Sequence, residues 1–303
     1  MPGTEGVTRR RGLRTVVAAA AAVPLLGTVR ASAARDGILR RTAPVPPLEV
    51  MTFNLRFAST REPNSWAARR PVMRALLREA APHVIGTQEG RLPQVRDIER
   101  DLGRHYDWIG TGRGGGDDES MAVLYDTRRL APVEHAHFWL SDTPKVTGSN
   151  TWGAAHPRMV TWVRFRDLRA RGQEFCLFNT HLDNASRYAR MRSVSLITSR
   201  LAQFDPALPL LVTGDFNAVA HRDPVHGALL DAGLVDTWDT ARGRGATYGT
   251  FHGYRGLTAG GDRIDWILAT PGVTVLRTWM HTYAADGQYP SDHLPVQATV
   301  SLG

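Results

Sequence analysis

Apolar and polar residues follow two alternating patterns between residues 48 and 303. Segments in which apolar residues run together or alternate with polar ones predict β-strands over 48–56, 84–87, 121–125, 159–165, 174–182, 208–213, 263–269, 273–280 and 294–302. Apolar residues three or four positions apart predict helices over 66–80, 93–102 and 187–204. So many strands with so few helices do not fit one open parallel sheet. They favour two packed sheets with helices on the outside.

The N-terminal residues follow a different pattern. Arginines at 9–11 precede an apolar run from Val16 to Val29, and the small residues Ala31-Ser32-Ala33 come next. This order is typical of a secretory signal peptide. The paired arginines resemble the twin-arginine class, although Gly12 stands where that class usually has Phe. We therefore expect a signal peptide at 1–33, a linker at 34–47, and a secreted domain at 48–303 without stable membrane association. The general secretory route and an uncleaved anchor are the alternatives.

Composition narrows the class of protein. The 303 residues are 42% hydrophobic and 22% charged, which is ordinary for a globular chain. Half of the net charge of +8 falls in residues 1–33, so the remaining excess does not by itself call for a nucleic-acid or membrane partner. Cys176 is the only cysteine. An intramolecular disulfide and a cysteine-rich zinc site are therefore excluded.

Polar residues recur where the predicted apolar strands end. This pattern collects Asn54, Gln88, Glu89, His181, Asp183, Asp215, Asn217, Asp265, Asp292 and His293. Strands of one sandwich bring such ends to a common rim, so we expect these side chains to lie together. Carboxylates brought together repel one another unless the repulsion is offset. A divalent cation offsets it, and oxygen ligands without cysteine favour Mg²⁺, Mn²⁺ or Ca²⁺ over Zn²⁺.

Five short segments carry a resemblance to a known family. They are Gln88-Glu89, Thr180-His181-Leu182, Gly214-Asp215-Phe216-Asn217, Ile264-Asp265 and Ser291-Asp292-His293. In order and rough spacing they resemble the endonuclease/exonuclease/phosphatase superfamily, which includes deoxyribonuclease I-like and exonuclease III-like enzymes. Residues 138–144 are similar to a bacterial subgroup, with Asp142 where that subgroup usually has Glu. The resemblance covers residues 48–303 and implies an α+β fold, a four-layer α/β/β/α sandwich of two mixed sheets flanked by helices.

The resemblance also implies roles around a metal ion. Glu89 is expected to be the main metal carboxylate, with Asn54 and Asp292 completing the metal shell or holding its waters. Asp215 is expected to orient or deprotonate the attacking water. Asn217 is expected to bind a phosphate oxygen, because residues two apart in an extended chain point to the same side.

The remaining matches concern two imidazoles and an arginine. His293 is expected to contact the scissile phosphate, with Asp265 as its orienting carboxylate. His181 resembles the second imidazole of the family, and Glu119 stands where the nuclease branch has the glutamate that pairs with it. An adjacent carboxylate raises the pKa of an imidazole, so both histidines are expected to be cationic. Arg158 resembles a phosphate-binding arginine, because a planar guanidinium suits two phosphate oxygens.

Several of these side chains have a structural interpretation as well. Glu119 follows Gly-Gly-Gly-Asp-Asp and fits a solvated loop carboxylate. Arg158 fits a surface arginine. His252 fits either the pocket wall or loop packing. Cys176 has phenylalanines nearby and is predicted to be an inert core thiol.

The expected activity is hydrolysis of a phosphate ester by a metal-assisted water. The matched segments do not determine the leaving group, so a nuclease acting on DNA or RNA and a phosphatase of a small phosphorylated metabolite stay open. A nuclease needs a long basic track with stacking aromatic residues. A secreted binding protein is the non-enzymatic alternative, and it is disfavoured because every acidic and imidazole position is filled. We expect a monomer whose partner is the phosphoester substrate, with nucleic acid as one form of that substrate.

Overall fold

Two β-sheets packed face to face form the centre of the computed structural model, which describes residues 45–303. The first sheet contains, in spatial order, β12 (Gly243–Arg244), β14 (Thr274–Met280), β15 (Val296–Ser301), β1 (Leu48–Asn54), β2 (Val84–Gln88), β6 (Val123–Asp126) and β4 (Tyr106–Ile109). The second contains β11 (Val235–Asp236), β13 (Asp265–Ala269), β10 (Leu210–Asp215), β9 (Glu174–His181), β8 (Met159–Asp167) and β7 (Leu130–Trp139). A small third sheet joins β3 (Gly90–Arg91) to β5 (Glu119–Ser120). The predicted signal peptide at 1–33 and residues 34–44 of the predicted linker lie outside the described residues.

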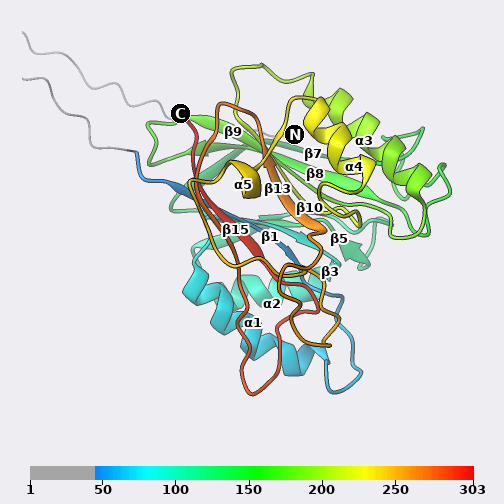
Figure 1. Cartoon of the computed structure of the whole chain (residues 1–303), viewed down its shortest axis with the longest axis vertical. Helices are drawn as coiled ribbons and strands as arrows, with labels where there is room; N and C mark the ends of the chain where they lie inside the picture. Colours follow the sequence, from blue (N-terminus) through cyan, green and yellow to red (C-terminus); the bar gives the residue numbers. More distant parts are fainter. Residues whose placement is uncertain (1–44) are drawn as a thin grey trace, which may run out of the picture. The chain divides into compact units, whose positions relative to one another are not determined.

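Each large sheet is mixed and carries helices on its outer face. In the first sheet β1 runs parallel to β2 and antiparallel to β15, and in the second β10 runs parallel to β9 and antiparallel to β13. The helices are α1 (Trp66–Ala80), α2 (Leu92–Leu102), α3 (Arg187–Leu201), α4 (Pro224–Asp231) and the short α5 (Thr237–Thr240). Figure 1 shows α1 and α2 beside the sheet of β1 and β15, and α3 and α4 beside the sheet of β9 and β10. The four-layer α/β/β/α prediction is confirmed.

Strand alternation explains why three large apolar clusters form. Successive side chains of a strand point to opposite faces, so a strand between two layers supplies both. Val50 of β1 belongs to the cluster between the sheets, whereas Met51 belongs to the cluster under α1 and α2. In β9, Leu177 faces the other sheet, and Cys176 packs with the cluster under α3 and α4. Burial raises the pKa of the Cys176 thiol to about 12, as an inert core thiol requires.

Polar side chains fill the space between the sheets next to the strand ends. Gln88 donates to Asn179 Oδ1 (2.7 Å), and Asn179 donates to the carbonyl oxygens of Thr87 (2.7 Å) and Ala122 (3.2 Å). Gln88 and Asn179 are fully buried. Because buried polar groups are costly unless they are hydrogen-bonded, this network holds the two sheets in one relative position. The network thereby also fixes where the site residues at the strand ends of the two sheets lie relative to one another.

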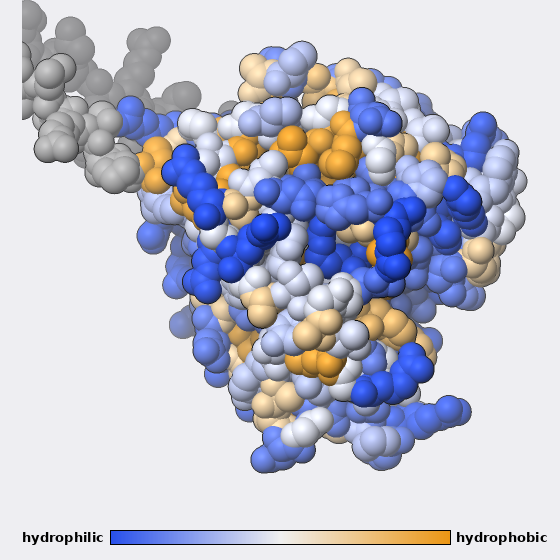
Figure 2. Space-filling model, in the orientation of Figure 1, coloured by the Kyte–Doolittle hydropathy of each residue, from blue (hydrophilic) through white to orange (hydrophobic). Residues whose placement is uncertain are grey.

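The elements that the pattern did not predict have weak local signals. β7 is an edge strand that contains Pro132 at a register shift and several exposed residues, so it lacks a continuous apolar pattern. α4 begins with Pro224 and contains Gly227, which lowers its helical signal. Within residues 45–303 no helix is long and apolar enough to cross a membrane. On the face drawn in Figure 2, hydrophilic residues predominate and hydrophobic ones form separate patches.

Candidate active site

The register of the second sheet places three predicted site residues in one row. His181 ends β9, Asp215 ends β10, and the two pair across the parallel ladder. Asp265 begins β13 and pairs with Asp215 across the antiparallel ladder. Asn54 ends β1 of the first sheet, opposite Gln88, and Glu89 follows directly. The predicted meeting of strand ends at one rim is confirmed for these residues.

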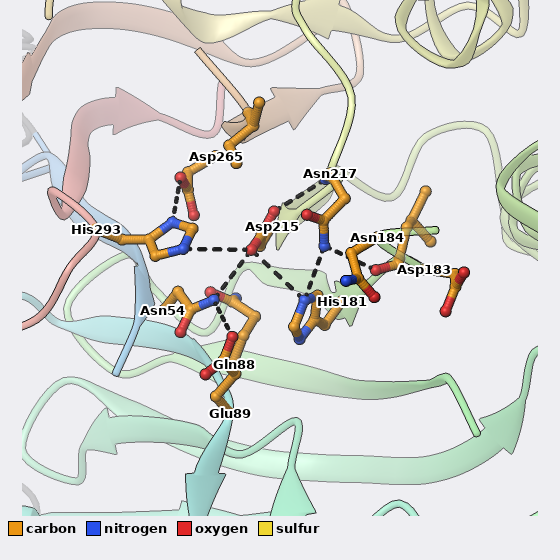
Figure 3. A network of polar contacts seen from close by, with 12 residues as sticks. Asn54, Gln88, Glu89, His181, Asp183, Asn184, Asp215, Asn217, Asp265 and His293 are labelled. Atoms are coloured by element: carbon orange, nitrogen blue, oxygen red, sulfur yellow. Dashed lines mark hydrogen bonds and ion pairs between the residues drawn. The ribbon is translucent and has the colours of Figure 1, made fainter. Parts of the chain in front are cut away.

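Asp215 is the central group of the site (Figure 3). Its Oδ2 accepts a hydrogen bond from Asn54 Nδ2 at 3.0 Å. The same oxygen lies 3.5 Å from His181 Nε2 and 3.8 Å from His293 Nε2. Its Oδ1 accepts from the backbone N–H of Asn217 at 2.9 Å. Asp215 is 1% exposed, so these polar partners replace its water.

Two of the site residues have left-handed backbone conformations. Asn217 has φ of 47° and Glu89 has φ of 61°. The prediction that Asn217 follows an extended chain is therefore wrong. Asn217 nevertheless lies in the site, as predicted. The left-handed turn directs its Nδ2 to His181 Nε2 and to the Leu182 carbonyl oxygen, both at 3.0 Å. Asparagine tolerates this conformation better than most residues, whereas at Glu89 it costs about 1 kcal/mol or more.

The two imidazoles differ in charge. His293 Nδ1 lies 2.9 Å from Asp265 Oδ2, as predicted. Burial lowers the pKa of His293, but the carboxylates of Asp265 and Asp215 outweigh it and raise that pKa to about 10. At His181 burial and the charge of Arg158 both lower the pKa, to well below its usual value. The prediction that both histidines are cationic is wrong for His181, because its burial and the charge of Arg158 lower the pKa although Asp215 lies 3.5 Å away.

Glu119 does not pair with His181, so this predicted contact is wrong. Its Oε2 lies 2.8 Å from Arg113 Nη1 instead. The Nδ1 atom of His181 is buried and has no hydrogen-bond partner among residues 45–303. Glu119 still lines the same pocket as His181. Burial, only partly offset by the charge of Arg113, raises the pKa of Glu119.

Arg158 lies inside the pocket and not on the surface. The residue is 4% exposed, and its Nη2 donates to Asn184 Oδ1 at 3.2 Å. Its Nε lies 3.5 Å from Asp183 Oδ2, but Nε and Nη1 have no hydrogen-bond partner in the described part of the chain. Burial, together with the charge of Arg113, lowers the pKa of Arg158. A buried guanidinium with unsatisfied donors is an arrangement suited to an anion.

The carboxylates that line the same pocket fit a divalent cation. Glu89, Asp215 and His293 each offer one atom within 4.8 Å of the others. His293 is protonated and has no free lone pair for a metal, which leaves Glu89, with Asp215 beside it, as the oxygen donors. Asn54 Nδ2 also donates to Glu89 Oε1 at 3.1 Å and so holds both carboxylates. Burial and the charge of Asp265 raise the pKa of Asp215 to about 7, although the charge of His293 acts in the opposite direction.

Asp292, the third predicted metal residue, lies outside this group. It lines the pocket, but its Oδ2 pairs with Arg56 Nη1 at 2.5 Å. The oxygen of Asn54 likewise accepts from the backbone N–H of Arg56 at 2.9 Å. In the structure Asn54 and Asp292 are therefore neighbours of the cation position, joined through Arg56.

The pocket has a volume of about 380 Å³ and includes residues that the motifs did not single out. These are Phe57, Arg113, His156, Asn184 and Phe251. Asn184 lies two residues after the matched segment Thr180-His181-Leu182, and His156 lies two residues before Arg158. Proximity to a motif was their only signal in the sequence. His252 does not line this pocket; its Nδ1 accepts from the Tyr254 N–H, so it belongs to the loop packing.

Fold and site together define a class of protein, a two-sheet sandwich with a carboxylate and imidazole site at one rim. The chain belongs to the Endonuclease/Exonuclease/phosphatase family, whose profile it matches over residues 51–293. Enzymes of this family hydrolyse phosphoester bonds, as nucleases or phosphatases, and are generally dependent on divalent metals.

Solved structures agree with this assignment. A family protein from Bacteroides thetaiotaomicron is 33% identical, with a TM-score of 0.78 over 84% of this chain and 97% of the other. The mannosyl-6-phosphatase of that organism is also 33% identical, with a TM-score of 0.75 over 84% and 99%. Protein angel of Drosophila melanogaster is 25% identical over 57% of this chain. The chain spans about half the length (49%) of this curated relative.

Proposed function

We propose that this protein is a metal-dependent phosphoesterase that hydrolyses small phosphorylated molecules by attack of a water on phosphorus. The observation that carries the proposal is the position of Asp215, in contact with imidazoles from two separate segments and next to Glu89. The size of the pocket favours a small substrate. The likeness to a mannosyl-6-phosphatase at 33% identity supports a phosphorylated metabolite over nucleic acid.

The residues of the chain divide the chemistry between them. A divalent cation at Glu89 would supply charge to the phosphate oxygens and to the attacking water. Asp215 accepts a hydrogen bond from that water and orients it, since its Oδ2 faces the pocket between both histidines. Cationic His293 stabilises negative charge as it develops on the phosphate, and Asp265 holds its ring in place. Asn217, oriented by its own backbone bond to Asp215, donates to His181 Nε2 and holds this neutral ring beside Asp215.

Metal removal tests the first part of the proposal. Exhaustive chelation with EDTA should abolish hydrolysis of p-nitrophenyl phosphate, and Mg²⁺ or Mn²⁺ should restore it. Glu89→Gln should need a higher metal concentration for half-maximal activity, because the change removes one negative charge and keeps the shape. The exposed Glu79, on α1, provides the matched Glu79→Gln control. Full activity after chelation would contradict metal dependence.

Replacement of the central carboxylate tests the second part. Asp215→Asn should lower kcat by about 10²- to 10⁴-fold, the range usual for loss of acid–base catalysis. Turnover should be measured on p-nitrophenyl phosphate, bis-p-nitrophenyl phosphate, hexose 6-phosphates, plasmid DNA, single-stranded DNA and RNA. Cleavage of the nucleic acids above the small esters would support a nuclease instead.

We also propose that the mature enzyme acts outside the cytoplasm, on the basis of the arginines at 9–11, the apolar run and Ala31-Ser32-Ala33. The mature N-terminus should then be Ala34 or Arg35, as read by mass spectrometry of the exported protein. Changing Arg9, Arg10 and Arg11 to Lys should block export through the twin-arginine route. Unchanged export would indicate the general secretory route, and a full-length cytoplasmic product would contradict the proposal.

A further inference from the structure

The pocket contains two arginines that the chemistry above does not use together. Arg113 and Arg158 both line the pocket, on the side of His181 and Asn184. They come from different parts of the chain, the glycine-rich loop before β5 and the segment before β8. Exposed His156 also lines the pocket.

Arg113 is held in place at three points. Its backbone N–H donates to the Glu119 carbonyl oxygen at 2.8 Å, and its own carbonyl oxygen accepts from Trp139 Nε1 at 2.6 Å. Its guanidinium pairs with the Glu119 carboxylate at 2.8 Å, and its side chain is 12% exposed. A surface arginine on a loop with three consecutive glycines would not need such support. The loop fixes this side chain before any substrate binds.

Arg158 lacks the partner that its burial calls for. The nearest carboxylate is Asp183, but that group already accepts three backbone hydrogen bonds, from Ala155, Ala185 and Ser186, at 2.7 to 3.1 Å. Asp183 therefore leaves Nε and Nη1 of Arg158 without hydrogen bonds. Two like charges facing one buried space are costly unless an anion lies between them. Burial and, after it, the charge of Arg113 lower the pKa of Arg158.

We propose that Arg113 and Arg158 together bind the terminal oxygens of a phosphomonoester, which makes the enzyme selective for monoesters over diesters. Glu119 is a positioning residue that sets the orientation of Arg113. A phosphomonoester carries a charge of about −1.5 to −2 at pH 7 and three terminal oxygens, whereas a diester carries one charge and two such oxygens. Two guanidinium forks match the first group. A diester has too few terminal oxygens and too little charge to engage both guanidinium groups.

This proposal rests on the phosphoesterase function proposed above, and the two have separate tests. The holoenzyme should show a higher kcat/KM on p-nitrophenyl phosphate than on bis-p-nitrophenyl phosphate. Arg113→Gln should lower kcat/KM by about 10- to 100-fold on the monoester, the loss of a charge-assisted hydrogen bond, and by less than threefold on the diester. Arg113→Lys should recover part of the loss, because it retains the charge without the fork. Glu119→Gln should raise KM for the monoester more than it lowers kcat.

Arg96, exposed on α2, provides the charge-matched control. Arg96→Gln should leave kcat/KM unchanged on both substrates. Thermal melts of every variant separate misfolding from loss of function. Equal losses on both substrates in Arg113→Gln, or a wild-type preference for the diester, would overturn the proposal.

A binding measurement keeps the inference testable if neither ester is hydrolysed. Calorimetric titration of the Mn²⁺-loaded protein should show inorganic phosphate binding more tightly than dimethyl phosphate. Arg113→Gln should weaken the binding of inorganic phosphate and leave that of dimethyl phosphate unchanged. If the protein shows this binding pattern but hydrolyses neither ester, only the proposed catalytic function is contradicted. Equal binding of inorganic phosphate by the wild type and Arg113→Gln would contradict the proposed binding role of the two arginines.

Discussion

Single side chains in the site are defined by their neighbours more than by their type. His181 and His293 are both imidazoles in contact with Asp215, yet only His293 has an aspartate at its Nδ1. His181 lies beside Arg158 and bonds Asn217, so it is neutral. His293 thus supplies charge, and His181 supplies a neutral ring that contacts both Asn217 and Asp215.

Removal of either ring should therefore be costly for a different reason. His293→Ala and His181→Ala should each lower kcat by about 10²-fold or more, within the range of acid–base and electrostatic catalysis. Both rings contact the same carboxylate, so the double variant should lose less than the product of the single losses. Steady-state kinetics give kcat for each variant, and His135→Ala, at an exposed position, is the control. Multiplicative losses, or near-normal turnover of His181→Ala, would contradict a joint role of the two rings around Asp215.

β2 approaches β9 and β10 closely at Gly86. A Cβ atom on Gly86 would overlap Thr213 Oγ1 and Asn179 Oδ1, both in the buried polar network between the sheets. The glycine is required here by close approach of the sheets, since its φ is not in the left-handed region. This contact keeps the strand end that bears Glu89 next to the strand end that bears Asp215.

A methyl group added at Gly86 of β2 should therefore lower stability, whereas one added at a glycine of an open helix face should raise it. Gly86→Ala should lower the free energy of unfolding by about 1 to 3 kcal/mol, as overpacking does. Gly227 in α4 is the matched control, because a Cβ there meets no atom within 4 Å. Gly227→Ala should raise stability by about 0.5 to 1 kcal/mol through helix propensity. Urea denaturation of both variants measures these changes in the free energy of unfolding. An unchanged free energy in Gly86→Ala would mean that the sheets can separate locally.

Sequence periodicity predicted the elements whose two faces differ in polarity. α1 begins and ends where predicted, and the strands that carry His181, Asp215 and Asp265 lie within two residues of their predicted limits. β7 and α4 were missed because an edge strand and a short glycine-containing helix bury too little for a regular pattern. The helix at 187–204 ends at Leu201, since residues 202–204 form turns rather than continuing the helix.

At the scale of the whole molecule, buried charge links elements from distant parts of the chain. Asp236 at the start of α5 bonds His226 of α4 at 3.0 Å and Arg263, before β13, at 2.8 Å. It also accepts from the Trp238 N–H. Burial raises the pKa of Asp236, but the bonds from His226 and Arg263 outweigh it and hold that pKa below 3.8. Asp236 therefore pairs with His226 and Arg263 at once, which explains why this histidine is structural.

The sign of the pH dependence follows from that lowered pKa. Ionised Asp236 stabilises the fold fully above the unfolded-state pKa of about 3.9, and this stabilisation is lost as the pH falls through the lower folded-state value. At pH 7 Asp236→Asn should cost about 3 to 5 kcal/mol, because it leaves the Arg263 charge buried without its partner. The difference from wild type should shrink below pH 4 in denaturant titrations. A constant difference down to pH 2 would contradict this account.

The strand ends that carry chemistry, and the presence of two sheets, were determined by the sequence alone, because both follow from local alternation of apolar and polar residues. Tertiary structure decided which charged groups pair. Glu119 lies near Arg113 rather than His181, and Arg158 faces the pocket rather than solvent. Pairing across the sheets depends on register, burial and the field of groups far apart in the chain. Protonation states depend on the same through-space interactions, so the neutral His181 beside the cationic His293 could be recognised only in the folded protein.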